Sequence, residues 1–217
     1  MNLPTKITVS RIIATAVIFI TLVTLYFINL SNLSFVTPYI TLGSVQIDIF
    51  FIILLVVFVI VALTDLVDGK LARARNEVTT LGKFLDPIAD KLLVNTMLIF
   101  LATLPIVAKY NTVQSVGISV WCAALMIARD IVVDSLRLIA ANKKVVIAAN
   151  IFGKVKTVFQ MIAIGVVLAN DFPFAFFDQG FPQGLRISDF LVYIATAISV
   201  ISGIIYVVQN KHVFKEE

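Results

Sequence analysis

Charged residues are scarce in this chain, and their scarcity indicates its class. Asp, Glu, Lys and Arg together make up 14% of the 217 residues, while apolar side chains make up 60%. Soluble domains carry about 25% charged residues, so we expect an integral membrane protein. At this length, the segments that cross the membrane leave no room for a second sizeable domain. We therefore predict a single membrane domain over residues 1–217.

Cysteine is almost absent as well. The one cysteine, Cys122, lies in an apolar stretch, which excludes a disulfide framework and a cysteine-based metal site within the chain. The sequence shows no internal repeat, and it lacks the paired interrupted segments that are typical of secondary transporters. Its first apolar stretch is longer than the apolar core of a signal peptide, so we expect this stretch to be retained.

Long apolar runs are what the chain has in abundance. A hydrocarbon core about 30 Å thick requires about 20 apolar residues per helix, and six runs approach or exceed this length. We predict an all-α integral membrane protein with six transmembrane helices and a short interfacial helix at the N-terminus. The expected spans are residues 11–30, 47–64, 84–106, 116–138, 146–168 and 190–209.

Lysine and arginine are unevenly divided among the segments that connect these spans. The connections after the first, third and fifth spans hold almost none, whereas the remaining connections and both ends of the chain hold most of them. Basic residues are retained on the cytoplasmic side of a membrane. We therefore expect a multi-pass protein of the cell membrane, with both termini and the connection around residues 65–90 in the cytoplasm.

Four aspartates occur in two pairs around that connection. Asp65 and Asp68 follow the second span, and Asp86 and Asp90 open the third. On a helix, the members of each pair share one face. If the two helices pack side by side, the carboxylates converge and repel one another. Mg2+ or Mn2+ prefers such oxygen ligands, so we predict a divalent-metal site; the alternative is a run of solvated charges in a loop.

The residues between the two pairs favour a phosphate ligand. Gly69 follows Asp68 directly, and glycine inside a helix costs about 1 kcal/mol relative to alanine. The close approach of a ligand would account for a glycine at this position. Ala72 lies one turn beyond Asp68 and keeps the same face open, and Arg73 offers a planar guanidinium group suited to phosphate.

The whole stretch has a recognisable form. It reads Asp65-x2-Asp68-Gly69-x2-Ala72-Arg73-x8-Gly82-x3-Asp86-x3-Asp90. This pattern resembles, position for position, the signature of the CDP-alcohol phosphatidyltransferase family. The resemblance implies a six-helix membrane fold that is usually a homodimer. It also implies an active site at the cytoplasmic membrane boundary, with two divalent ions, Mg2+ or Mn2+.

The same resemblance assigns roles to individual residues. It implies one metal ion held by Asp65, Asp68 and Asp86, and a second held by Asp65, Asp86 and Asp90. Asp90 would also be the catalytic general base that takes the proton of the acceptor hydroxyl. The CDP part of the lipid donor would be bound by a larger set: Pro4, Thr5, Asp65, Asp68, Gly69, Ala72, Arg73 and Thr79.

A second charged cluster lies at the end of the fourth span and the start of the fifth. Two arginines and two aspartates fall within about two helical turns, and two lysines open the next span. Cations that face a shared cavity suit an anionic acceptor such as a phosphate monoester. Ordinary anchoring of basic residues at the cytoplasmic boundary is the alternative. We predict that the acceptor phosphate is bound by Arg129, Arg137, Lys154 and Lys156.

Three further stretches are similar to the branch of the family that uses glycerol 3-phosphate: NLPTKITVSR, RDIVVDSLR and GKVKTVFQ. Asp130 departs from the glutamate expected in that branch but keeps a carboxylate. The resemblance implies transfer of the phosphatidyl group from CDP-diacylglycerol to sn-glycerol 3-phosphate, giving phosphatidylglycerol phosphate and CMP. Membrane lipids are expected as partners, and nucleic acid is not. Another acceptor (serine, inositol phosphate or phosphatidylglycerol) stays open, as does a cation transporter that uses intramembrane acids.

Overall fold

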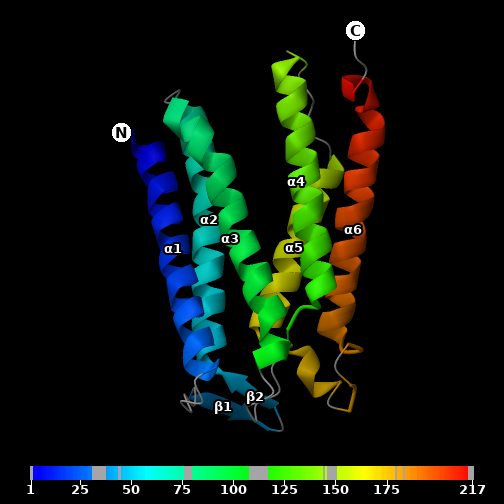
Figure 1. The fold of residues 1–217 in the computed structure, drawn as a ribbon. Helices are drawn as coiled ribbons and strands as arrows, with labels where there is room; N and C mark the ends of the chain where they lie inside the picture. The colour runs from blue at the N-terminus through cyan, green and yellow to red at the C-terminus, as the bar shows by residue number, and fades with distance from the viewer. Residues whose placement is uncertain are drawn as a thin grey trace.

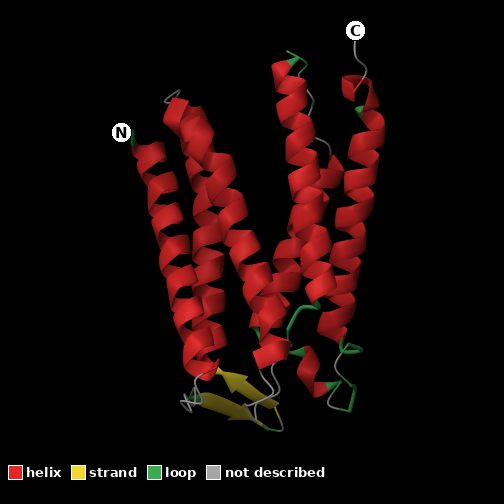
Figure 2. Ribbon diagram, in the orientation of Figure 1, coloured by secondary structure: helices red, strands yellow, loops and turns green. Residues whose placement is uncertain are grey.

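A computed structural model describes most of the chain: residues 2–30, 38–43, 45–75, 80–107, 117–143, 145, 151–178, 180–182 and 184–214. Within these residues, six long α-helices make up most of the fold (Figure 2). They are α1 (Leu3–Leu30), α2 (Ile49–Arg75), α3 (Thr80–Val107), α4 (Val120–Asn142), α5 (Ile151–Leu168) and α6 (Ile187–Gln209). Two short 3-10 helices, η2 (Phe174–Phe176) and η3 (Lys211–Phe214), flank α6. The prediction of a predominantly helical chain is confirmed.

The helices run alternately in opposite directions, so that both ends of the chain lie at one end of the bundle (Figure 1). We call this the N/C end. On one side of the bundle α1 packs against α2 and α3, and on the other side α6 packs against α4 and α5. Helix α3 connects the two sides, because it contacts α4 and α5 as well as α1 and α2.

A β-hairpin lies at the opposite end of the bundle, which we call the hairpin end (Figure 2). Strands β1 (Tyr39–Leu42) and β2 (Val45–Asp48) pair antiparallel, with Tyr39 opposite Asp48 and Leu42 opposite Val45. Gly43 takes a φ of 63° in the turn, a conformation that favours glycine. Asp48 then accepts a hydrogen bond from the backbone N–H of Phe50 at 2.8 Å, which stabilises the start of α2. The all-α prediction missed this hairpin.

The separate interfacial helix expected before the first span is wrong, because α1 is continuous from Leu3 to Leu30. Pro4 lies in its first turn, where no backbone N–H is needed for an intrahelical bond. Buried polar residues then recur every three or four positions along one face. The helix continues without a break past residue 11, where the first span was expected to begin. The buried polar residues are Thr5, Thr8, Arg11 and Thr15.

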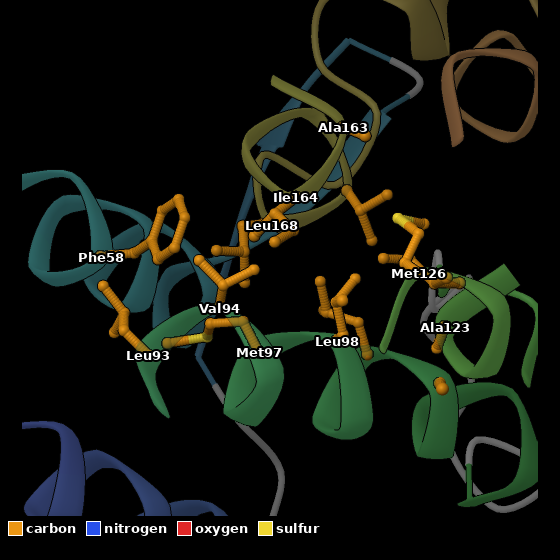
Figure 3. Packing of buried hydrophobic residues seen from close by; sticks show 14 of the residues in the cluster. Phe58, Leu93, Val94, Met97, Leu98, Ala123, Met126, Ala163, Ile164 and Leu168 are labelled. Atoms are coloured by element: carbon orange, nitrogen blue, oxygen red, sulfur yellow. The ribbon is translucent and has the colours of Figure 1, made fainter. Parts of the chain in front are cut away.

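A shared apolar core joins the two sides of the bundle. Phe58 of α2, Met97 of α3, Met126 of α4 and Ile164 of α5 are buried in this core (Figure 3). Large apolar side chains also cover the outside of the helices, and Trp121 is 80% exposed. Extended apolar surfaces of this kind are typical of contact with a membrane.

Among the described residues, four helical stretches are long and apolar enough to cross a membrane: Thr5–Ile28, Phe84–Leu104, Ile151–Leu168 and Ile187–Gln209. The apolar stretch of α2, Ile49–Thr64, is shorter. Helix α4 carries two arginines and two aspartates in its length. Several apolar helices therefore fit a membrane protein, and the count of six spans stays a prediction.

Candidate active site

The two pairs of aspartates lie on neighbouring helices, as predicted. Asp65 and Asp68 belong to the last turns of α2, and Asp86 and Asp90 belong to the first turns of α3. Helices α2 and α3 contact each other, and these turns lie toward the N/C end (Figure 1). The alternative, in which the aspartates lie in a loop, is wrong because all four are helical.

On α3 the aspartates are accessible. Asp86 is exposed and Asp90 is partly exposed, while Ala89 between them is fully buried. Carboxylates one helical turn apart present oxygens to the same space. Hard divalent ions such as Mg2+ and Mn2+ take such ligands, so this half of the predicted donor set fits a metal ion.

The other half of the predicted donor set belongs to the last turns of α2. At Asp65, Asp68, Gly69, Ala72 and Arg73 the structure describes only the helical backbone. Among the described residues, no three acidic, histidine or cysteine side chains form a group that could hold a metal. The described side chains include Asp86 and Asp90 of the four aspartates. The metal ligands and the CDP contacts of this stretch stay predictions.

The predicted nucleotide contacts near the N-terminus lie at the same end of the bundle. Thr5 is buried in the first turns of α1, and Pro4 belongs to the same turn, although its side chain is not described. Thr79 lies outside the described residues. The roles of all three in binding CDP stay predictions.

Thr8 joins α1 to α3 at the aspartate pair. Its hydroxyl donates a hydrogen bond of 2.7 Å to Oδ1 of Asp86. The sequence analysis missed Thr8. The signal that could have found it is the recurrence of Thr5, Thr8, Arg11 and Thr15 at helical spacing in an otherwise apolar helix.

The second charged cluster connects α4, α5 and α6. Lys156 of α5 donates to both carboxylate oxygens of Asp130 on α4, at 2.8 and 2.7 Å. Arg129 donates to the same carboxylate at 3.0 Å and to the hydroxyl of Ser202 on α6 at 2.9 Å. Asp130 is 8% exposed and Lys156 is 5% exposed. The cluster is therefore an internal ion network with two cations around one carboxylate.

A glycine on α6 makes room for this network. A Cβ atom on Gly203 would lie 2.7 Å from Cγ of Arg129, which is closer than real Cβ contacts allow. The absence of a side chain at this position lets the Arg129 side chain pack closely against α6. Sequence reasoning also missed this relationship, because it depends on which helices pack together.

The remaining predicted acceptor cations do not join the network. Arg137 donates from Nε to the hydroxyl of Tyr206 at 3.0 Å, and its guanidinium carbon lies 5.4 Å from the centre of the same ring. Lys154 is exposed. The structure thus brings together Arg129 and Lys156, but both are paired with Asp130, and a phosphate would have to share them with that carboxylate.

An ion pair connects the two charged clusters. Lys91, which follows Asp90 on α3, forms an ion pair with Asp134 on α4. Asp134 lies one helical turn beyond Asp130. The pair places the start of α3 beside the ion network of α4 and α5.

The sequence as a whole matches one protein family. The family model described as CDP-alcohol phosphatidyltransferase matches residues 1–204. The chain belongs to this family. The resemblance seen in the aspartate pattern is confirmed by a match that extends far beyond that pattern.

Three relatives carry the name CDP-diacylglycerol–glycerol-3-phosphate 3-phosphatidyltransferase. The Bacillus subtilis protein is 34% identical over 99% of this chain and 97% of its own length. The Mycoplasma pneumoniae protein is 33% identical over 96% of this chain and 87% of its own length. A Rickettsia bellii relative is 35% identical over 77% of this chain and 75% of its own length. The chain is therefore similar, nearly from end to end, to enzymes named for glycerol 3-phosphate.

Proposed function

We propose that the protein transfers the phosphatidyl group of CDP-diacylglycerol to sn-glycerol 3-phosphate, giving phosphatidylglycerol phosphate and CMP. The observation that carries this proposal is the similarity to the Bacillus subtilis enzyme of that name, which covers 99% of this chain. The family match over residues 1–204 supports the type of reaction. The helical placement of the four aspartates at one end of the bundle supports the location of the site.

The reaction needs an activated hydroxyl group and a stabilised diphosphate. The acceptor oxygen forms a bond to the phosphorus that carries diacylglycerol, the bond from that phosphorus to the oxygen of CMP breaks, and the hydroxyl proton passes to Asp90. Asp65, Asp68, Asp86 and Asp90 would hold two divalent ions, Mg2+ or Mn2+. When bound, these ions supply charge neutralisation on the attacking and leaving oxygens. Arg73 would contribute a further cation to the donor phosphates.

The acceptor phosphate would lie near the ion network of α4 and α5. Lys156 and Arg129 surround a single carboxylate, Asp130, so the network has an excess of positive charge. The Lys91–Asp134 ion pair supports a position beside Asp90. Arg137 and Lys154 would extend the positive surface toward the N/C end.

Two further features belong to this proposal. The clustering of lysine and arginine in alternate connections supports a cell-membrane protein whose termini and site face the cytoplasm. The common position of both ends of the chain is compatible with that orientation (Figure 1). A homodimer surrounded by membrane lipids is part of the same proposal.

The test is release of CMP by the purified protein in detergent, with CDP-diacylglycerol and either Mg2+ or Mn2+. We expect release that requires both the metal and glycerol 3-phosphate. Serine, inositol phosphate and phosphatidylglycerol serve as alternative acceptors in parallel assays. Release with one of these, and not with glycerol 3-phosphate, would contradict the acceptor but keep the chemistry. No release with any acceptor would contradict the proposed reaction.

A further inference from the structure

A buried hydroxyl group on α1 is directed at an accessible carboxylate on α3. Thr8 is 2% exposed, whereas Asp86 is exposed, and 2.7 Å separate Oγ1 of Thr8 from Oδ1 of Asp86. We propose that Thr8 is a positioning residue, which orients the Asp86 carboxylate for a divalent cation. This inference rests on the proposed function, in which Asp86 is a metal ligand.

Burial of the acceptor does not explain the hydrogen bond, because Asp86 is exposed. An exposed carboxylate is solvated by water, so Asp86 needs no protein donor to offset a desolvation cost. A hydrogen bond to a charged acceptor is shorter and stronger than one between neutral groups, and the distance of 2.7 Å fits this class. The bond engages one carboxylate oxygen, Oδ1, and restricts rotation of the carboxylate.

Thr8 differs from other threonines of the same helix. The hydroxyl of Thr15 donates to the backbone carbonyl of Arg11 at 2.9 Å, and that of Thr21 donates to the carbonyl of Val17 at 2.9 Å. Bonds of this kind satisfy a hydroxyl within its own helix. The hydroxyl of Thr8 reaches a side chain on another helix, 78 positions away in the sequence.

The packing of α1 on α3 holds Thr8 in place. Thr5 and Thr15 are buried on the same face of α1, and Ala89, which is 0% exposed, lies one turn after Asp86 on α3. A small side chain at that position lets two helices approach closely. The donor is therefore held in a buried position, while the acceptor is exposed to solvent.

Groups that hydrogen-bond a metal ligand set its orientation, and their loss typically lowers metal affinity 10- to 100-fold. Thr8→Val removes the hydroxyl and keeps the volume. We expect Mn2+ to bind this variant about 10-fold more weakly, measured by electron paramagnetic resonance on the purified protein in detergent without substrates. The Mn2+ concentration that gives half-maximal CMP release should rise by a similar factor, with the rate largely recovered at saturating Mn2+.

Two variants separate positioning from packing. Thr8→Ser keeps a hydroxyl group and should bind Mn2+ within about twofold of the wild type. Thr15→Val removes a buried hydroxyl from the same face of α1, about two helical turns beyond Thr8, and should leave Mn2+ binding unchanged. Equal weakening in Thr8→Val and Thr15→Val would indicate a packing role and overturn the inference.

The outcomes also distinguish this inference from the proposed function. If the wild type releases CMP, and Thr8→Val binds Mn2+ as tightly as the wild type does, the role of Thr8 is overturned and the proposed function stands. Thr8-dependent Mn2+ binding without CMP release would support the role of Thr8 and contradict the reaction. A wild-type protein that binds neither Mn2+ nor Mg2+ would overturn both.

Discussion

Lys91 of α3 forms an ion pair with Asp134 of α4, and this pair connects the two charged clusters of the protein. The ammonium group of Lys91 also interacts electrostatically with Asp90 and Asp130. Both members of the pair are partly exposed, so the pair itself adds little to the free energy of unfolding. Its significance is geometric, because it relates the predicted general base to the predicted acceptor site.

Asp90→Asn should abolish turnover while the fold is kept. An amide cannot take the proton of the acceptor hydroxyl, and general-base catalysis contributes about 10²- to 10⁴-fold in rate. Because Asp90 is partly exposed, the isosteric replacement should change the unfolding temperature little. CMP release at saturating Mg2+ and thermal unfolding in detergent measure the two effects. Near-normal turnover of the purified variant would reject Asp90 as the base.

Replacement of the predicted acceptor cations should affect one substrate more than the other. Arg129→Gln or Arg137→Gln should raise the KM for glycerol 3-phosphate more than the KM for CDP-diacylglycerol, since loss of a charge-assisted phosphate contact weakens binding of that group. The initial rate of CMP release at varied concentrations of each substrate measures both constants. Lys143→Gln, an exposed change just beyond α4, is the control for simple membrane anchoring. An unchanged KM for glycerol 3-phosphate in both arginine variants would favour anchoring.

The features of this protein that could be predicted from its sequence are those that depend on the spacing of nearby residues and on the length of apolar runs. Helical spacing placed Asp65 with Asp68 and Asp86 with Asp90, and the structure has these pairs on adjacent helices. Apolar run length indicated the long helices. The family followed from fixed positions in one stretch, and its match over residues 1–204 confirmed it.

The missed features depend on how one helix is rotated against another. The partners of Lys156 and Arg129 lie on different helices, and nothing in the spacing of residues along α4 or α5 indicates that both converge on Asp130. The hydrogen bond from Thr8 to Asp86 is a similar case. The prediction assigned four cations to the acceptor phosphate from their positions along the chain, and the packing pairs two of them, Arg129 and Lys156, with the Asp130 carboxylate.

Replacing only one member of the Lys156–Asp130 ion pair should lower the free energy of unfolding. Asp130→Asn leaves the buried Lys156 ammonium without its carboxylate, and removing one member of a buried ion pair typically costs about 3–5 kcal/mol. Thermal unfolding in detergent measures this loss. The double variant Asp130→Asn with Lys156→Met removes both charges and should recover part of the unfolding temperature. A double variant less stable than either single one would contradict this account.

A pair of buried carboxyl groups lies at the hairpin end, between α5 and α6. Asp171 is 1% exposed, with a φ of 63°, and its carboxyl group interacts with that of Asp178. Asp178 accepts a hydrogen bond from the backbone N–H of Ile187 at 3.1 Å. Burial, and then the neighbouring Asp178, raise the pKa of Asp171 from its ordinary value of 3.8 to about 7, while Ser188 and Arg186 act in the opposite direction.

This raised pKa predicts that the protein loses stability as the pH rises from about 4 to about 7. In that window folded Asp171 keeps a proton that the unfolded chain has released, so the folded state binds more protons and its stability falls with pH. The unfolding temperature in detergent should be lower at pH 8 than at pH 5. A loss of 1 kcal/mol corresponds to about 2–4 °C for a chain of this size. Asp171→Asn should reduce the difference between the two pH values, because the amide does not titrate. An Asp171→Asn variant with the full wild-type pH dependence would assign the effect to other groups.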